Sequence, residues 1–190
     1  MKVLLLGPHR PNIEACLHHR GEDILRTEEP LSSESALLEN VAFIVSYGYR
    51  HILKRDLIQR FPKRIINLHI SMLPWNRGAD PNLWSFLEDT PKGATIHYID
   101  EGLDTGDVLV QQEVDYERND TLRTSYERLS QTIEDLFMEH WPALRDNRLT
   151  AKAQTRKGTS HTLKDREKFT HLLHLGWDTP VRDLIGKALR

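Results

Sequence analysis

The stretch RIINLHISMLPWNRGADPNLWSFLEDTPKGATIHYIDEGLDTGD, residues 64–107, predicts the centre of the fold. It opens on an apolar, β-branched run, after which Asn67 and His69 stand two residues apart. Residues two apart in a strand point to the same face, so the amide and the imidazole should share one space. A proline-containing loop, a short helix and a strand over 93–99 then lead into a polar turn at 100–107. Polar groups at the ends of strands in an open α/β sheet are typical of a binding site.

Apolar runs alternate with helical patterns on both sides of this stretch. Strands are predicted at 2–6, 22–26, 41–46 and 108–114, with the last antiparallel to 93–99. Helices are predicted from Pro11 to Gly21, from Ser32 or Ser33 through Leu38, over 52–61, and over 122–144, where apolar residues recur at steps of three and four. This alternation predicts an α/β fold with a mostly parallel twisted sheet flanked by helices.

The C-terminal part of the chain is more polar. Residues 150–165 predict a linker, and a helix is expected over 164–175. Thr179 and Pro180 suggest the N-cap and first turn of a last helix. We therefore expect a catalytic domain at 1–149 and a linker with a short helical extension at 150–190 that packs on it.

Composition narrows the function classes. The net charge is −2 for 190 residues, which gives no sign of a surface for nucleic acid. No apolar run has the length of a membrane span, and the apolar start before Gly7 is too short for a signal peptide. One cysteine, Cys16, suits a reducing compartment, so the cytoplasm is expected. The ten histidines lack the cysteine or carboxylate partners of a metal site, and no metal is expected.

Two motifs in the central stretch resemble those of the folate-dependent formyltransferases. Asn67-Leu68-His69, followed by Ser71-Met72-Leu73-Pro74, resembles the Asn-x-His and Ser-Leu-Leu-Pro signature of that family. Leu103-Asp104-Thr105-Gly106-Asp107 resembles its Leu-Asp-Thr-Gly-Asp loop. The two matches occur in the family's order and at similar spacing. The resemblance implies a Rossmann-like formyltransferase core, here with a trimmed N-terminal half.

The resemblance also implies catalytic roles. Formyl transfer needs an amine to attack an N-formyl carbon, and the tetrahedral oxyanion that forms needs fixed hydrogen-bond donors. We expect Asn67 and His69 to serve the oxyanion and the incoming amine, and Asp104 to orient His69 and relay protons. Asp100 and Glu101 compete for the carboxylate role, but Asp104 occupies the family's catalytic position. His97 is expected to be structural or to lie at the edge of the site.

The implied formyl donor is 10-formyltetrahydrofolate. Family members hold the pterin largely through backbone groups of the loop after the third strand and of the Asp loop. The corresponding residues here are Tyr49, Arg50, Ile52, Asp100, Gly102 and Leu103.

The acceptor is predicted to be a nucleotide-linked amino sugar. The loop Gly7-Pro8-His9-Arg10-Pro11-Asn12 replaces the Gly-rich phosphate loop of glycinamide ribonucleotide enzymes, and its prolines cannot donate an N–H to phosphate. Arg77-Gly78-Ala79-Asp80-Pro81 resembles instead the methionyl-tRNA and sugar enzymes. The residues expected to contact the acceptor are Trp75, Arg77, Asn82 and Trp84.

Several alternatives stay open at this stage. One alternative acceptor is a carrier-bound aminoacyl group, as in the related formylation domains of nonribosomal peptide synthetases. Another is an amine like that of glycinamide ribonucleotide. A formyltetrahydrofolate hydrolase would use the same residues and release formate. A homodimer through the C-terminal helices is also an expectation.

Overall fold

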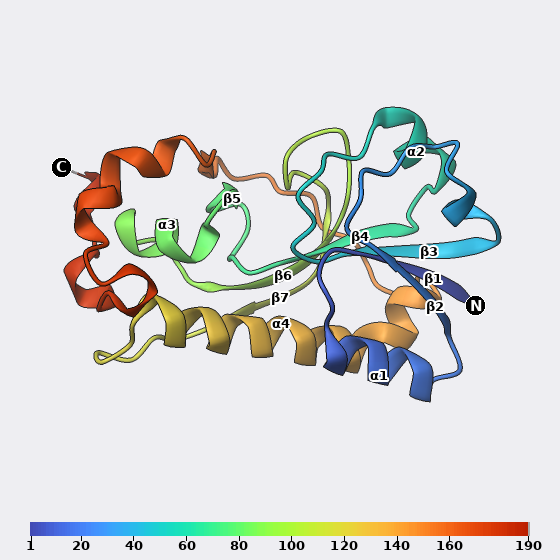
Figure 1. The fold of residues 1–190 in the computed structure, drawn as a ribbon, viewed down its shortest axis with the longest axis horizontal. Coiled ribbons are helices and arrows are strands. Elements are labelled where there is room, and N and C mark those ends of the chain that lie inside the picture. Colours follow the sequence, from blue (N-terminus) through green and yellow to red (C-terminus); the bar gives the residue numbers. More distant parts are fainter. Residues whose placement is uncertain (190) are drawn as a thin grey trace.

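A computed structural model describes residues 1–189. At its centre is a six-stranded sheet in the order β2-β1-β3-β4-β6-β7 (Figure 1). The strands are β1 (Lys2–Leu6), β2 (Asp23–Thr27), β3 (Val41–Ser46), β4 (Ile65–His69), β6 (Gly93–Tyr98) and β7 (Val108–Glu113). The first four run parallel, whereas β6 is antiparallel to both β4 and β7. The predicted α/β class, with a mostly parallel sheet, is confirmed.

Helices cover both faces of this sheet. α1 (Pro11–His19) and the long α4 (Leu122–Arg145) lie side by side on one face, and α2 (Arg55–Arg60) lies on the other (Figure 1). The central strands β1 and β3 read as continuous apolar runs because helices bury them on both sides. α4 begins with a capping box between Thr121 and Thr124, which satisfies the first free N–H groups of the helix.

A third apolar cluster forms away from the sheet, around α3 (Pro81–Leu87). The side chains of Leu83, Phe86 and Leu87 pack there against Val181 and Leu184 of the C-terminal segment. This segment and α3 lie together at the left of Figure 1. The packing agrees with the expected extension, but the boundary at residue 149 stays a prediction.

Several expected helices are shorter or of another type. The segment before β3 has only a 3₁₀ turn, Ala36–Leu38, whose N-cap is Ser35 rather than Ser32 or Ser33. The expected helix over 52–61 is reduced to α2. Residues 164–175 form the 3₁₀ helix Asp165–Leu172.

The expected last helix does not form. In its place are the 3₁₀ turns Gly176–Asp178, Val181–Asp183 and Lys187–Leu189. Thr179 does not N-cap a helix; it follows the turn Gly176–Asp178, and its hydroxyl donates back to the Gly176 carbonyl. Gly186 adopts a φ of 70°, which breaks any continuous helix at that point.

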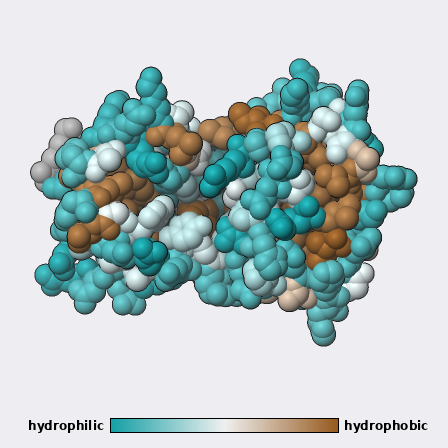
Figure 2. Space-filling view, in the orientation of Figure 1, coloured by the Kyte–Doolittle hydropathy of each residue, from teal (hydrophilic) through white to brown (hydrophobic). Residues whose placement is uncertain are grey.

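The segment predicted as a linker also has structure. Within it, β8 (Ser160–His161) pairs in parallel with β5 (Arg77–Gly78) to form a second, two-stranded sheet. None of the helices in residues 1–189 is long and apolar enough to cross a membrane. Hydrophobic surface on the face in Figure 2 occurs in separate patches, one over α3 and the C-terminal segment at the left and others at the right.

Candidate active site

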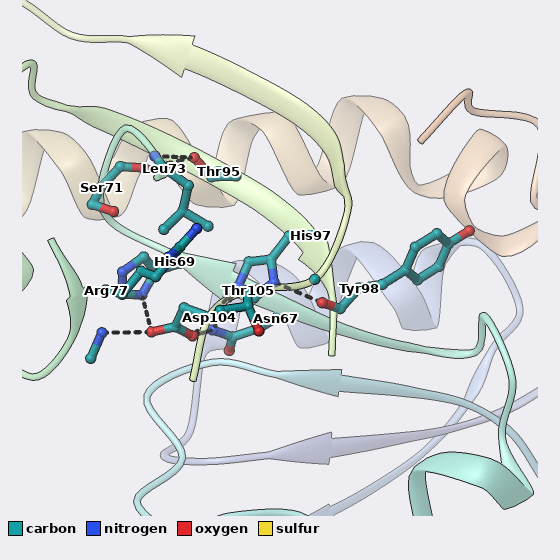
Figure 3. Close-up of polar contacts among 12 residues, drawn as sticks. Asn67, His69, Ser71, Leu73, Arg77, Thr95, His97, Tyr98, Asp104 and Thr105 are labelled. Carbon is teal, nitrogen blue, oxygen red and sulfur yellow. Dashed lines mark hydrogen bonds and ion pairs between the residues drawn. The ribbon is translucent and has the colours of Figure 1, made fainter. Parts of the chain in front are cut away.

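Asn67 and His69 both point from β4 toward Asp104, as the two-residue spacing predicts (Figure 3). The Asn67 amide nitrogen lies 3.2 Å from Asp104 Oδ1, and His69 Nδ1 lies 3.7 Å from Oδ2. The three predicted catalytic side chains therefore meet, although the first two come from a strand and the third from a loop 35 or more residues later. Their assignment as catalytic stays a prediction that this geometry supports.

Asp104 is held in an unusual backbone conformation. Its φ is 52°, a left-handed value that few residues other than glycine adopt without cost. The Gly78 N–H donates to Oδ2 at 2.8 Å and fixes the carboxylate on the side of β5. Burial alone would raise the pKa of Asp104, but His69, His97 and this N–H hold it well below its ordinary value. Asp104 is therefore a permanent negative charge at neutral pH.

The protonation of His69 follows from its other contact. Nε2 lies 3.1 Å from the Asn76 carbonyl oxygen, which can only accept a hydrogen bond, so Nε2 carries a proton. Burial lowers the pKa of His69, and Asp104 opposes that shift without reversing it. Neutral His69 therefore presents an unprotonated Nδ1 toward Asp104. Such a nitrogen can accept a proton, and the neighbouring carboxylate stabilises the imidazolium that results.

His97 belongs to the same cluster, on the side of Asp104 away from Arg77. It stands opposite Asn67 in the β4–β6 ladder and is only 1% exposed. Its Nδ1 contacts the Tyr98 carbonyl at 2.8 Å, so neutral His97 has an unprotonated Nε2. That nitrogen lies 3.3 Å from the Asn67 amide nitrogen and 3.5 Å from Asp104 Oδ1.

This arrangement engages the amide nitrogen of Asn67. The amide nitrogen faces Asp104 Oδ1 on one side and His97 Nε2 on the other, which leaves Oδ1 of Asn67 as the free atom of the amide. Asn67 must therefore rotate its amide before it can donate to an oxyanion. Sequence reasoning placed His97 at most at the edge of the site. The register of β4 against β6 places His97 directly opposite Asn67, and a prediction of that pairing would have identified His97 as part of the site.

A cavity of about 320 Å³ opens next to these residues. Asn67, His97 and Asp104 form one wall of it, and further lining comes from Ser46, Tyr49, His51, Ile52, Leu53, Ile99, Asp100, Glu101, Gly102 and Leu103. Five of the six residues expected to hold the formyl donor are among them. Arg50 is the exception: it is exposed and does not line the cavity. Ile52 and Leu103 are 84% and 50% exposed, so they offer apolar surface at the cavity to a flat ring.

The competing carboxylates have other partners. Asp100 accepts from the Thr105 hydroxyl and the Gly102 N–H, as a turn former does. Glu101 forms an exposed ion pair with Arg55. Neither contacts His69 in the structure, which agrees with the choice of Asp104.

The four residues expected at the acceptor divide into two pairs. Trp75, in the loop after β4, and Arg77, in β5, are partly exposed, and Arg77 lies on the opposite side of Asp104 from His97 (Figure 3). Asn82 is 2% exposed, donates to the Leu122 carbonyl and accepts from Ser125, so its polar atoms serve the α3–α4 contact. Trp84 is 4% exposed and stacks on His161 with ring centres 3.6 Å apart. Burial of α3 therefore removes Asn82 and Trp84 from the acceptor set.

Within residues 1–189, no group of three or more His, Cys, Asp or Glu side chains has an arrangement that could hold a metal ion. The site is thus a cluster of one carboxylate, one amide and two imidazoles, of which Asp104, Asn67 and His97 line the cavity. It can hold and transfer protons and can donate hydrogen bonds to a developing charge.

The family model described as formyl transferase matches residues 14–140, and the chain belongs to this family. Among solved structures, the chain is similar to the formyltransferase PseJ from Anoxybacillus kamchatkensis, crystallised with UDP-4,6-dideoxy-4-formamido-L-AltNAc and tetrahydrofolate. The two chains are 58% identical with a TM-score of 0.97, over 99% of this chain and 100% of that one.

Curated relatives include the dTDP-4-amino-4,6-dideoxyglucose formyltransferase of Mycobacterium bovis. It is 36% identical over 140 residues, which are 70% of this chain and 59% of the relative. The methionyl-tRNA formyltransferase of Prochlorococcus marinus is 29% identical over 83% of this chain and 53% of its own length. The chain thus spans little more than half the length of these curated relatives. The predicted family is confirmed.

Proposed function

We propose that this protein is an N-formyltransferase that moves a formyl group from 10-formyltetrahydrofolate to a primary amine of a nucleotide-linked amino sugar. The observation that carries the proposal is the meeting of Asn67, His69 and Asp104, of which Asn67 and Asp104 line the 320 Å³ cavity. Membership of the formyl transferase family supports the same reaction.

The cavity fits a folate donor. Its lining combines apolar side chains such as Ile52 and Leu103 with backbone groups of residues 100–104, and a pterin needs both an apolar surface and hydrogen-bonding partners. Tyr49, Asp100 and Gly102 complete the residues that we assign to the donor. The donor supplies the formyl group, and PseJ was crystallised with tetrahydrofolate.

In this mechanism the amine attacks the formyl carbon and the new C–N bond gives a tetrahedral oxyanion, which collapses as the bond to the folate nitrogen breaks. His69 Nδ1 receives the proton of the amine, since Nε2 is already engaged by Asn76. Asp104 stabilises the imidazolium, which then passes the proton to the folate nitrogen as that nitrogen leaves. Asn67 turns its amide away from His97 to donate to the oxyanion. One such donor is worth about 3 kcal/mol in related sites.

The acceptor we propose is a 4-amino sugar linked to UDP or dTDP. PseJ was crystallised with a UDP-linked 4-formamido sugar, and the M. bovis relative is named for a dTDP-linked 4-amino sugar. Arg77 lies on the His69 side of Asp104, and Trp75, two residues earlier, is also partly exposed (Figure 3). A guanidinium and an aromatic ring suit phosphates and sugar rings.

The test is a transfer assay with 10-formyltetrahydrofolate and a panel of UDP- and dTDP-linked 4-amino and 3-amino sugars. Mass spectrometry should find one sugar heavier by a single carbonyl unit, and none with His69→Ala. Formate release without a sugar product would point instead to a hydrolase. Transfer to a carrier-bound aminoacyl group or to glycinamide ribonucleotide, and to no sugar, would overturn the acceptor class.

We also propose that the enzyme works in the cytoplasm as a homodimer. Its single cysteine suits a reducing compartment. Leu175, Trp177 and Leu189 of the C-terminal segment are 54%, 45% and 70% exposed, and they offer apolar surface to a second copy. Light scattering behind size exclusion should give twice the monomer mass, and Trp177→Glu should restore the monomer. A monomer at all concentrations would contradict the dimer.

A further inference from the structure

Residues 150–161, which we term the strap, cross the site between two anchored ends. At one end the backbone of Lys152 exchanges two hydrogen bonds with Val108, both 2.8 Å long. At the other end β8 pairs with β5. Gly158 lies against the Pro74 carbonyl so closely that a Cβ there would be 1.8 Å from its oxygen. The strap is therefore a fixed part of the site rather than a free linker.

Gln154 lies midway along the strap, and both polar atoms of its side-chain amide form hydrogen bonds within the site. Its Nε2 donates to the backbone carbonyls of Asp104, at 3.0 Å, and Gly106, at 2.8 Å. Its Oε1 accepts from Nε and a terminal nitrogen of Arg77, at 3.2 and 2.7 Å. Carbonyls only accept and guanidinium groups only donate, so the amide has one chemically acceptable orientation.

These contacts close a ring through the site. Gln154 donates to the backbone carbonyl of Asp104, and the Asp104 carboxylate accepts from the Gly78 N–H. Gly78 follows Arg77 in the chain, and Arg77 donates to Gln154. Hydrogen bonds thus hold Asp104 at both its backbone carbonyl and its carboxylate. They stabilise the left-handed backbone conformation of Asp104, which costs free energy.

We propose that Gln154 is a positioning residue for the transfer reaction, which holds the Asp104 loop toward His69 and at the same time presents Arg77 to the acceptor. The inference rests on the proposed function for the roles of Asp104 and Arg77. The NH₂ group of Gln154 donates to the loop that carries Asp104, and its carbonyl oxygen accepts from Arg77 on the acceptor side. These two halves of the side-chain amide can be separated by substitution.

Gln154→Glu separates them. Its carboxylate still accepts from Arg77, but an oxygen now faces the carbonyls of Asp104 and Gly106, and the loop is repelled. We expect kcat to fall by about ten- to a hundredfold, the scale of a small misplacement of a reacting group, while the KM for the sugar stays near that of the wild type. Gln154→Leu removes both halves, so kcat should fall and the sugar KM should also rise.

Lys152→Ala is the matched control, because its exposed side chain lies on the same strap and only its backbone is anchored. It should leave kcat and KM unchanged. A merely structural role for Gln154 would lower the melting temperature of both Gln154 variants and leave the kcat and the sugar KM of the folded protein near their wild-type values. Wild-type kcat and KM in both Gln154 variants would overturn the inference.

A second readout does not depend on turnover. The Gly78 N–H donates to the Asp104 carboxylate, so its hydrogen exchange reports whether the loop is in place. Exchange at Gly78 and over residues 102–107 should accelerate in Gln154→Glu and Gln154→Leu but not in Lys152→Ala. Unchanged exchange would overturn the inference. Faster exchange in a protein that formylates no sugar would overturn the proposed function alone.

Discussion

A single carboxylate organises the site at the scale of residues. Asp104 faces His69, Asn67 and His97 and also accepts from the backbone of Gly78. The N–H groups of Asn67 and Gly78 favour the ionised form, as does protonation of either imidazole, and this offsets the cost of taking the charge out of water. The charge in turn favours protonation of His69. In the mechanism that we propose, this is the step that takes the proton from the amine.

We predict that Asp104→Asn lowers kcat by about a hundredfold or more, because a neutral amide cannot stabilise the imidazolium of His69. Its side-chain oxygen can still accept from Gly78, so the fold should persist. Steady-state kinetics measure the first effect, and circular dichroism with a thermal melt checks the second. A kcat within a few fold of the wild type would remove Asp104 from the mechanism.

The pH dependence of kcat tests the role of His69. The base must be neutral, so activity is held above its pKa and is lost as the pH falls through it. Burial lowers that pKa, so the acid limb of kcat should lie below the ordinary histidine value of about 6.5.

Asp104 raises the pKa of His69 against this trend, so residual activity in Asp104→Asn should have its acid limb at still lower pH. A pH profile of kcat for both proteins measures the two positions. An acid limb that moves upward, or not at all, would contradict this coupling between the two residues.

At the scale of elements, the antiparallel pairing of β4 with β6 builds the cluster. It sets His97 opposite Asn67 and turns the chain after β6 so that the Asp104 loop returns over β4. α3 has a different role, since nearly all of its side chains are buried. It joins the C-terminal segment to α4 and keeps Asn82 away from the cavity.

Asn82 therefore gives a prediction that separates packing from acceptor binding. Asn82→Ala leaves the Ser125 hydroxyl without its acceptor and should destabilise the fold by about 1–3 kcal/mol. The KM for the sugar should not change. Urea unfolding and steady-state kinetics give the two values. An unchanged stability with a raised KM would return Asn82 to the acceptor site.

At the scale of the whole molecule, the chain after α4 completes both the packing and the site. Val181 and Leu184 are fully buried against α3, and the strap fixes the loops that hold Asp104 and Arg77. We propose on these grounds that residues 150–190 belong with the catalytic domain as one folding unit, beyond the packing contact first expected.

A chain that ends at residue 149 should consequently lose cooperative unfolding, since it exposes the apolar side of α3. Calorimetry should show a weak or absent transition and dye binding should rise. The full-length Leu189→Ser variant is the control, because the side chain that it changes is 70% exposed. A sharp transition in the shorter chain would show that residues 1–149 fold alone.

Local sequence patterns predict most of the strands of the fold and part of the candidate site. The strands, the long helix α4 and the shared face of Asn67 and His69 follow from periodicities of two and 3.6 residues, which depend only on neighbours along the chain. The meeting with Asp104 was inferred from motifs that resemble the formyltransferases, because no local pattern brings a later loop to β4.

The remaining features depend on contacts between distant segments. Gln154 reaches Asp104 across 50 residues, His97 meets Asn67 through strand register, and Trp84 is buried by His161 of the strap. The apolar spacing after Thr179 suggested a helix, yet packing against α3 selected 3₁₀ turns, because so short a helix has little stability of its own. Periodicity along the chain thus set the strands and the faces of their side chains. Burial, register and the partner of each polar group arose only when those elements packed together.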